Sequence, residues 1–254
     1  MSVASAAILI AGALAHQAAA QAYGQPVYPG YQGFLDNPDG SVTMVFQYFS
    51  HGRDPVILPA GERNRFSGHA DRNQPTVFEP GNHEDVCVIV VESRQEAHQL
   101  RWFISFPDNE WSTSVDPLNA EYMLTERAAK EAQRDLDVGS APRGVCIDKP
   151  PTVRANRLRR FAERSSGTIE NLAAHVGESV RLNGQARDEG LPRGSTVEVE
   201  WSLVTGPAAA DFADCGSATT TVRFASAGTY ELELTATDGT ASSSDRLRFE
   251  VSAE

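Results

Sequence analysis

The sequence predicts a mainly β protein: two small antiparallel β-sandwich domains joined by a linker with a short helix. The clearest observation is the segment Gly228 to Gly239, in which apolar residues at positions 230, 232, 234 and 236 alternate with polar ones. One face of such a strand has to be buried, so a second sheet must cover it. The composition agrees, because twenty Gly and fourteen Pro in 254 residues favour short strands and turns. A Gly-, Ser- and Pro-containing stretch at residues 139–151 separates the two domains.

Residues 1–22 are predicted to be a secretory signal peptide. They carry no Lys, Arg, Asp or Glu, are apolar from Val3 to Ala15, and end in the small-x-small sequence Ala20-Gln21-Ala22. The segment lacks a basic start, and the alternative is a short membrane anchor, although the run is short for a span. No later segment is apolar enough to cross a bilayer. We therefore expect a soluble mature protein in the periplasm or outside the cell, with no membrane span after signal removal.

The net charge of −12 is unevenly distributed. Residues 127–164 hold ten Lys or Arg and five Asp or Glu, so the middle is basic and the flanks are acidic. An acidic bulk surface argues against nucleic acid as a partner. The basic candidates Arg157, Arg159 and Arg160 either form an arm that binds polyanions or lie against the protein's own acidic faces.

The first domain is expected at residues 23–125. A turn is predicted at Asn37 to Gly40, and strands at 42–48, 56–58, 86–91 and 100–106. Six consecutive apolar residues, Val86 to Val91, predict a strand that is covered on both faces. A helix is expected at about residues 126–136, within a basic helix and linker region that spans 126–168.

The motifs of this domain resemble an uncharacterised family of secreted bacterial proteins. The matching features are the Asn-Pro-Asp-Gly turn at 37–40, the aromatic pair Tyr48-Phe49, the Arg65-Phe66 pair with Asp71 downstream, and Gln-Pro-Thr-x-Phe at 74–78. The sequence His51-Gly52-Arg53 departs from the Asn/Arg-rich loop of that family. The resemblance implies no activity.

Residues 169–254 are predicted to form a second sandwich. Short alternating strands are expected around 180–182, 197–203, 222–224, 229–237 and 247–251. Trp201 in mid-strand and the run from Ala225 through Gly239 resemble polycystic-kidney-disease-like (PKD-like) and related immunoglobulin-like repeats. That resemblance implies a spacer or adhesion unit, and hence a binding or structural role.

No catalytic motif is present in the sequence. Gly-x-Ser-x-Gly is missing, and His83-Glu84-Asp85 lacks the second His of a zinc-protease motif. The first hypothesis is therefore a secreted or periplasmic, non-enzymatic binding or structural protein, whose partner is an unknown protein or a glycan. The alternative is a carbohydrate-binding accessory protein or a hydrolase with its site in loops 51–85.

Two groups of residues are candidates for metal binding. His69, Asp71, His83 and Asp85 offer imidazole and carboxylate ligands within one loop region. Asp188, Glu189 and Asp238 lie in turns of the second domain, where related modules carry calcium, although a calcium site needs six to eight oxygens. For both groups the alternative is an ordinary solvated acidic loop, and no other cofactor is expected.

The aromatic residues fall into two sets. Trp102, Trp201, Phe224 and Tyr230 occupy inward positions of strands and are predicted to be core. Tyr28, Tyr31 and Phe34 lie with Tyr23 in a Gly- and Pro-rich lead-in, and are candidates for a surface that stacks on carbohydrate. The alternative is that these residues close one end of the sandwich.

Three cysteines allow at most one intramolecular disulfide. Cys87 lies within an apolar run and is expected to be a free, buried thiol. Cys146 and Cys215 lie in loop-like surroundings beside glycines, so the predicted bridge is Cys146 to Cys215. Three free thiols remain the alternative.

Overall fold

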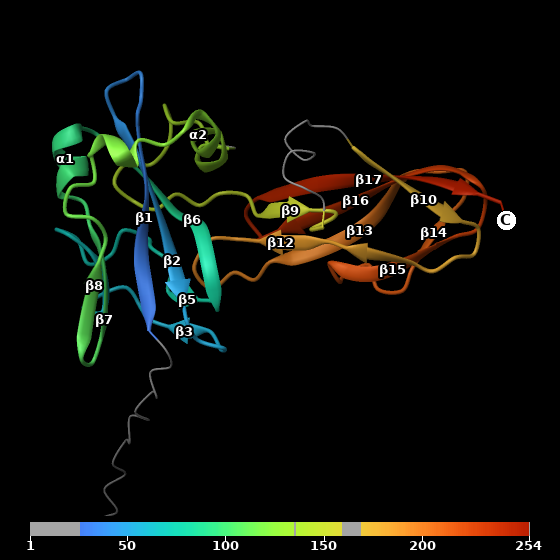
Figure 1. The fold of residues 1–254 in the computed structure, drawn as a ribbon, viewed down its shortest axis with the longest axis horizontal. Helices are drawn as coiled ribbons and strands as arrows, with labels where there is room; N and C mark the ends of the chain where they lie inside the picture. Colours follow the sequence, from blue (N-terminus) through green and yellow to red (C-terminus); the bar gives the residue numbers. More distant parts are fainter. Residues whose placement is uncertain (1–25, 135, 159–168, 254) are drawn as a thin grey trace, which may run out of the picture.

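The computed structural model describes residues 26–134, 136–158 and 169–253. The chain forms two β-rich domains that follow one another along the long axis of the molecule (Figure 1). The predicted mainly β fold class is confirmed. No helix within the described ranges is long and apolar enough to cross a membrane. The predicted signal peptide lies outside these ranges.

The first domain contains two three-stranded sheets. One has the order β1-β2-β6 and the other β4-β7-β8, and all pairings in both are antiparallel. The elements of this domain are β1 (Val27–Asp36), β2 (Val42–Ser50), β3 (Val56–Ile57), β4 (Asn64–Phe66), β5 (Val77–Phe78), β6 (Gly81–Val91), α1 (Arg94–Gln99), β7 (Trp102–Phe106), β8 (Asn109–Ser112), η1 (Ala120–Tyr122) and α2 (Glu126–Ala132).

The core of the first domain is aromatic. Trp102 is fully buried, as predicted, and it lies parallel to Phe66 with the ring centroids 5.8 Å apart. On the opposite face of the β1-β2-β6 sheet, Val45 and Val88 pack against Ala132 of α2. The prediction that residues 86–91 form a strand covered on both faces is therefore confirmed. Helix α2 ends at Ala132, earlier than the predicted residue 136.

The second domain packs a four-stranded sheet, β10-β17-β16-β13, against a three-stranded sheet, β11-β15-β14. Its strands are β10 (Glu170–His175), β11 (Val180–Asn183), β12 (Gln185–Arg187), β13 (Glu198–Thr205), β14 (Ala210–Phe212), β15 (Thr219–Phe224), β16 (Gly228–Thr237) and β17 (Ser242–Ser252). Trp201, Phe224 and Tyr230 are buried as predicted. The sandwich is not purely antiparallel, because β10 pairs in parallel with β17.

Part of the predicted linker belongs to the second domain. Residues Thr152–Arg154 form β9, which pairs with β12, and Ala155 is fully buried in the second core. The composition of residues 139–151 indicated a linker, but the following Thr-Val-Arg has the character of a short strand. The covalent crossing between the domains is therefore confined to a few residues around Asp148 to Pro151.

The disulfide joins Cys87 to Cys146 across 59 residues, and Cys215 is free and exposed. The prediction of a Cys146–Cys215 bridge with a free Cys87 is wrong. It treated the strand of Cys87 as central, whereas β6 is the edge of its sheet. Segment 143–147 lies along that edge, where Gly144 N donates to Val90 O and Ile147 N donates to Val88 O. This pairing brings Cys146 beside Cys87.

Candidate functional site

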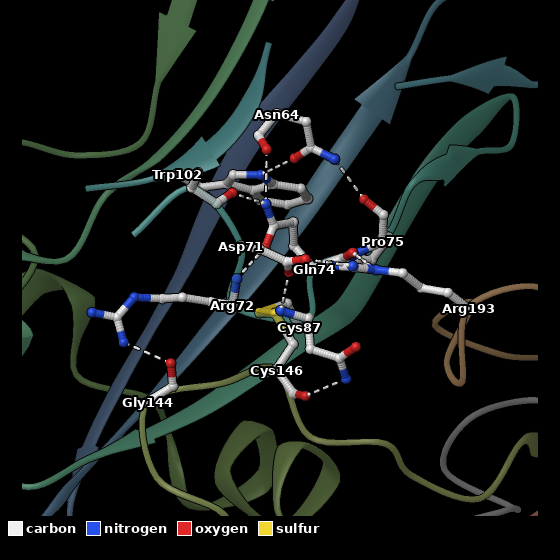
Figure 2. Close-up of a disulfide and its surroundings, with 12 residues drawn as sticks. Asn64, Asp71, Arg72, Gln74, Pro75, Cys87, Trp102, Gly144, Cys146 and Arg193 are labelled. Atoms are coloured by element: carbon white, nitrogen blue, oxygen red, sulfur yellow. Dashed lines mark hydrogen bonds and ion pairs between the residues drawn. A yellow bond between two sulfur atoms is a disulfide. The ribbon is translucent and has the colours of Figure 1, made fainter. Parts of the chain in front are cut away.

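The loop between β4 and β5 is organised by two buried amide side chains. Asn64 donates from Nδ2 to Leu58 O and to Pro75 O, and its Oδ1 accepts from Trp102 Nε1 at 2.9 Å. Gln74 donates from Nε2 to Asn64 O and Ala70 O, and accepts from Arg72 N at 2.7 Å. Both residues are fully buried, so these bonds satisfy polar groups that would be costly to leave unpaired. Figure 2 shows this network above the disulfide.

The same loop holds the segment that carries Cys146. Arg72 O accepts from Cys146 N at 2.6 Å, and Arg72 Nη1 donates to Gly144 O at 2.6 Å. Asn73 Nδ2 donates to Cys146 O at 3.1 Å. The disulfide thus joins β6 to the segment around Cys146, which residues 72–73 also hold. Together these contacts fix the chain just before it crosses to the second domain.

The second domain reaches the same loop through residues 191–193, which we call the clamp. Leu191 is fully buried and belongs to the core cluster of the first domain, not of its own. Arg193 makes a two-pronged ion pair with Asp71, at 2.6 and 2.8 Å, and donates from Nε to Gln74 O at 3.0 Å (Figure 2). A paired guanidinium of this kind fixes direction as well as distance. The clamp therefore sets the orientation of the two domains.

A cleft of about 130 Å³ lies between the domains beside the clamp. Residues 83–86 of β6 line one wall, and residues 149–154 and 187–189 line the other. Its lining mixes both signs of charge. The acidic residues are Glu84, Asp85, Asp188 and Glu189, and the basic ones are Arg134, Lys149, Arg154 and Arg187. Thr240 Oγ1 donates to Asp148 Oδ2 at 3.1 Å, which ties the β16–β17 turn to the crossing segment.

Burial raises the pKa of several carboxyl groups at this junction. The pKa of Glu189 is raised to about 8, first by desolvation and then by the charge of Asp188. Glu189 Oε1 accepts from Lys149 N at 2.5 Å, which partly offsets that rise. Desolvation also raises the pKa of Asp85 and of Asp188. Burial at the junction has thus removed water from these carboxylates, and the charge of Lys149 offsets only part of the effect at Asp85 and Glu189.

Two groups of residues were predicted to bind metal, one in each domain. Throughout the described ranges, no group of three or more His, Cys, Asp or Glu side chains is placed to hold an ion. Asp188 Oδ1 and Asp238 Oδ2 are buried oxygens without a hydrogen-bond partner, but the Asp238 carboxylate is already engaged through Oδ1 with Thr240 and Ala241. Calcium at Asp188, Glu189 and Asp238 stays a prediction.

The four residues of the first-domain metal candidate have separate roles. Asp71 pairs with Arg193, and His83 stacks on Tyr48 with the ring centroids 4.7 Å apart. Asp85 lines the junction cleft, whereas His69 is exposed on the loop. The spacing of these residues in the sequence placed them in one loop region. In the structure His83 and Asp85 line a common cleft, whereas Asp71 is held at the clamp.

The candidate aromatic platform is also divided by the structure. Phe34 is buried in the core, and Tyr31 packs against that core between Phe46 and Tyr122. These two residues pack into the domain because the lead-in forms strand β1, which has a bulge between Tyr31 and Gly33. Tyr28 is half-buried at the surface and touches the rings of His51 and Trp111.

Of the three basic candidates, the structure describes only Arg157. Arg157 is exposed, and its backbone N donates to Asn183 O at 2.8 Å. Arg159 and Arg160 lie outside the described residues.

Sequence reasoning missed the clamp altogether. The signal that pointed to it is Leu191, a lone apolar residue in an otherwise polar loop, Asp-Glu-Gly-Leu-Pro-Arg-Gly.

Comparison with known proteins identifies the second domain. Residues 169–251 match the family model described as K319L-like, PKD domain. Among solved structures, the PKD domain of human KIAA0319 is 19% identical, with 42% of this chain and 84% of that one covered and a TM-score of 0.30. Drosophila N-cadherin EC1-3 is 13% identical, with 89% and 68% covered and a TM-score of 0.32. The fibronectin(III)-like modules of Clostridium thermocellum CbhA are 12% identical, with 92% and 93% covered and a TM-score of 0.28. Residues 169–251 form a PKD-like domain, an assignment that rests on the family model.

Proposed function

We propose that the protein is a secreted or periplasmic, non-enzymatic binding or structural protein, in which the PKD-like domain is a rigid support that presents the first domain. The observation that carries this proposal is the clamp. A flexible spacer needs few contacts across its linker, whereas here Leu191 enters the core of the neighbouring domain and Arg193 is held at three points. Domain motion is the ordinary expectation unless such an interface restrains it.

The junction itself supports a structural role. Its cleft of about 130 Å³ is small beside ligand pockets, which are typically about 300 to 1,000 Å³. The buried amide side chains of the loop that meets the clamp, Asn64 and Gln74, are bonded to protein atoms. We infer that the junction sets geometry and that recognition of a protein or glycan takes place on an outer surface.

The proposal is tested by asking whether the two domains move together. Small-angle X-ray scattering and ¹⁵N relaxation of the full chain should show one particle with a single tumbling time. The Leu191→Ala/Arg193→Ala double variant should show two tumbling times, and Val204→Ala, an exposed change in the second domain, should match the wild type. Independent tumbling of the wild-type domains contradicts the rigid-support proposal.

Three further measurements address the remaining parts of the proposal. Sequencing the N-terminus of the mature protein from the periplasm or the culture medium tests the secretory signal. A screen with chromogenic glycosides, esters and peptides tests the non-enzymatic role, because turnover that follows the purified protein contradicts it. Calorimetric titration with Ca²⁺ tests the calcium prediction, for which Asp238→Asn is the matched variant.

A further inference from the structure

One face of the β1-β2-β6 sheet is only partly covered by helix α2. Strand pairing places Tyr28 of β1 opposite Phe49 of β2, and Phe49 opposite Asn82 of β6. Neighbouring residues of the strand point the other way, since Tyr48 and His83 stack on each other on the core side. Tyr28, Phe49 and Asn82 therefore form a row across three strands on the outer face.

Helix α2 covers this face at Val45 and Val88, so the row lies beyond the helix toward the end of the sheet (Figure 1). Phe49 remains 39% exposed, and Asn82 and Glu84 are exposed. A single exposed Phe is ordinary, but one that continues into partly exposed rings is a candidate for a binding surface.

Further rings extend the row at its β1 side. The Tyr28 ring meets Trp111 edge-to-face with centroids 4.9 Å apart, and Trp111 meets Phe106 at 5.9 Å. His51 touches both Phe49, at 4.6 Å, and Tyr28, at 5.6 Å. The rings hold one another in place, so binding would cost little side-chain entropy. We call the set Tyr28, Phe49, His51, Asn82 and Trp111 the aromatic row.

The polar groups beside the row are planar and hydrogen-bonding. A Cβ atom built on Gly30 would lie 2.6 Å from Gln47 Cγ, so the Gln47 side chain lies directly over this glycine. Asn82 Nδ2 donates to Glu84 Oε1 at 3.4 Å, which sets the carboxylate next to the amide. The outer-face positions at this end are residues 28, 30, 47, 49, 82 and 84. They carry one carboxylate and neither Lys nor Arg.

We propose that the aromatic row binds a neutral, extended glycan chain, with one sugar residue lying over each strand. This deepens the proposed function, on which it rests, by naming the ligand class and the surface. The faces of a pyranose ring present C–H groups that pack on aromatic rings, and its hydroxyl groups need amide and carboxylate partners at the ring edge. Strands lie about 4.8 Å apart, close to the length that one pyranose adds to an extended chain.

The charges at the outer-face positions favour a neutral glycan over an anionic one. An anionic polysaccharide or a nucleic acid requires Lys or Arg beside the rings, and none of the six outer-face positions carries one. Lys and Arg side chains lie past the β6 end of the row, in the junction cleft, where carboxylates accompany them. Glu84 also lines the junction cleft, so the β6 end of the row faces the PKD-like domain, whose orientation the clamp fixes. A long chain that follows the row would therefore pass beside the second domain.

The test uses the full mature chain and isothermal titration with cellohexaose and chitohexaose, with heparin and decaproline as probes of the competing ligand classes. We expect one of the neutral hexasaccharides to bind. Phe49→Ala and Trp111→Ala should each weaken that binding at least tenfold, and Asn82→Ala about threefold. Phe49→Tyr should retain it. Val204→Ala, which replaces a side chain of similar exposure in the other domain, is the matched control and should bind like the wild type.

The outcomes separate this inference from the proposed function. Absence of hexasaccharide binding overturns the inference, and so does binding that Phe49→Ala leaves unchanged or tighter binding of heparin or decaproline. None of these results alters the scattering and relaxation measurements, which test the rigid support. Circular dichroism of each variant confirms its fold. If Phe49→Ala does not fold, Asn82→Ala at an exposed position keeps the test valid, because binding that it leaves unchanged also overturns the inference.

Discussion

The two domains differ in how their cores are closed. In the PKD-like domain, β16 pairs with β17 over ten consecutive residues through a short turn, and the inward residues of both strands supply much of the core. The first domain completes its core with distant parts of the chain, Cys146 from the crossing segment and Leu191 from the other domain. The alternation of apolar and polar residues along a strand predicts a core like that of the PKD-like domain. It does not predict which distant segment will pair with the edge of a sheet, as in the first domain.

The largest expected effect concerns the segment that closes the edge of β6. Replacing both Cys87 and Cys146 with Ala should lower the free energy of unfolding by about 4 kcal/mol, as expected for a loop of 59 residues. Urea unfolding followed by tryptophan fluorescence measures it. The exposed Cys215→Ser is the control and should change stability by less than about 0.5 kcal/mol. An equal loss in both variants would contradict the assigned bridge.

Leu191→Ala should cost about 3 kcal/mol, because it empties a fully buried site. Because Leu191 packs in the core of the first domain, the loss of stability should appear in that domain. Amide exchange should accelerate in β4 and β7 of the first domain, although the mutation lies in the second. Val204→Ala should leave both domains unchanged. Faster exchange confined to β13 and β16 would show that Leu191 serves its own domain instead.

The same comparison explains which sequence predictions succeeded. Residues 228–239 and Trp201 were predicted in detail, because alternation and turn residues are local signals. The run at 86–91 was correctly predicted to be covered on both faces, yet its place at the sheet edge, and hence the partner of Cys87, depended on pairing with residues 143–147. Likewise Tyr31 and Phe34 were candidates for a surface platform, with closure of the sandwich end as the alternative, because a Gly- and Pro-rich strand has an irregular composition. Tyr28 is the one residue of the aromatic row that the sequence indicated as a binding candidate. The others are brought beside it by the register between strands, which is not a local signal.

The junction should make stability depend on pH. The pKa of Glu189 is about 8 in the folded state and about 4.5 when unfolded, so the folded state binds the extra proton between these values. Stability should therefore fall as pH rises from about 5 to 8, by on the order of a few kcal/mol. The other titratable groups that line the same cleft are His83, Glu84, Asp85, Asp188, Arg134, Lys149, Arg154 and Arg187.

Glu189→Gln isolates this contribution, because its amide oxygen still accepts from Lys149 N and cannot ionise. Urea unfolding at pH 5, 6, 7 and 8 should give a flatter profile for this variant than for the wild type. Glu198→Gln, an exposed change in the same domain, should retain the wild-type slope. A wild-type profile that rises from pH 5 to 8, or one that Glu189→Gln leaves unchanged, would contradict the buried, protonated carboxyl group.

The smallest effect is expected at the ion pair of the clamp. Asp71 and Arg193 are partly exposed, so Arg193→Ala should cost only about 1 kcal/mol, including the bond to Gln74 O. Arg193 lowers the pKa of Asp71, and a carboxylate with a lowered pKa stabilises the fold above its unfolded pKa and loses that contribution as pH falls. The difference between wild type and variant should therefore shrink below about pH 4, and 1 M salt should reduce it at pH 7. Arg193→Lys should recover only part of the stability, because Lys cannot bond both carboxylate oxygens in the same fork. If Arg193→Lys restores it fully, the pair acts by charge alone, and Leu191 is left to fix the orientation of the domains.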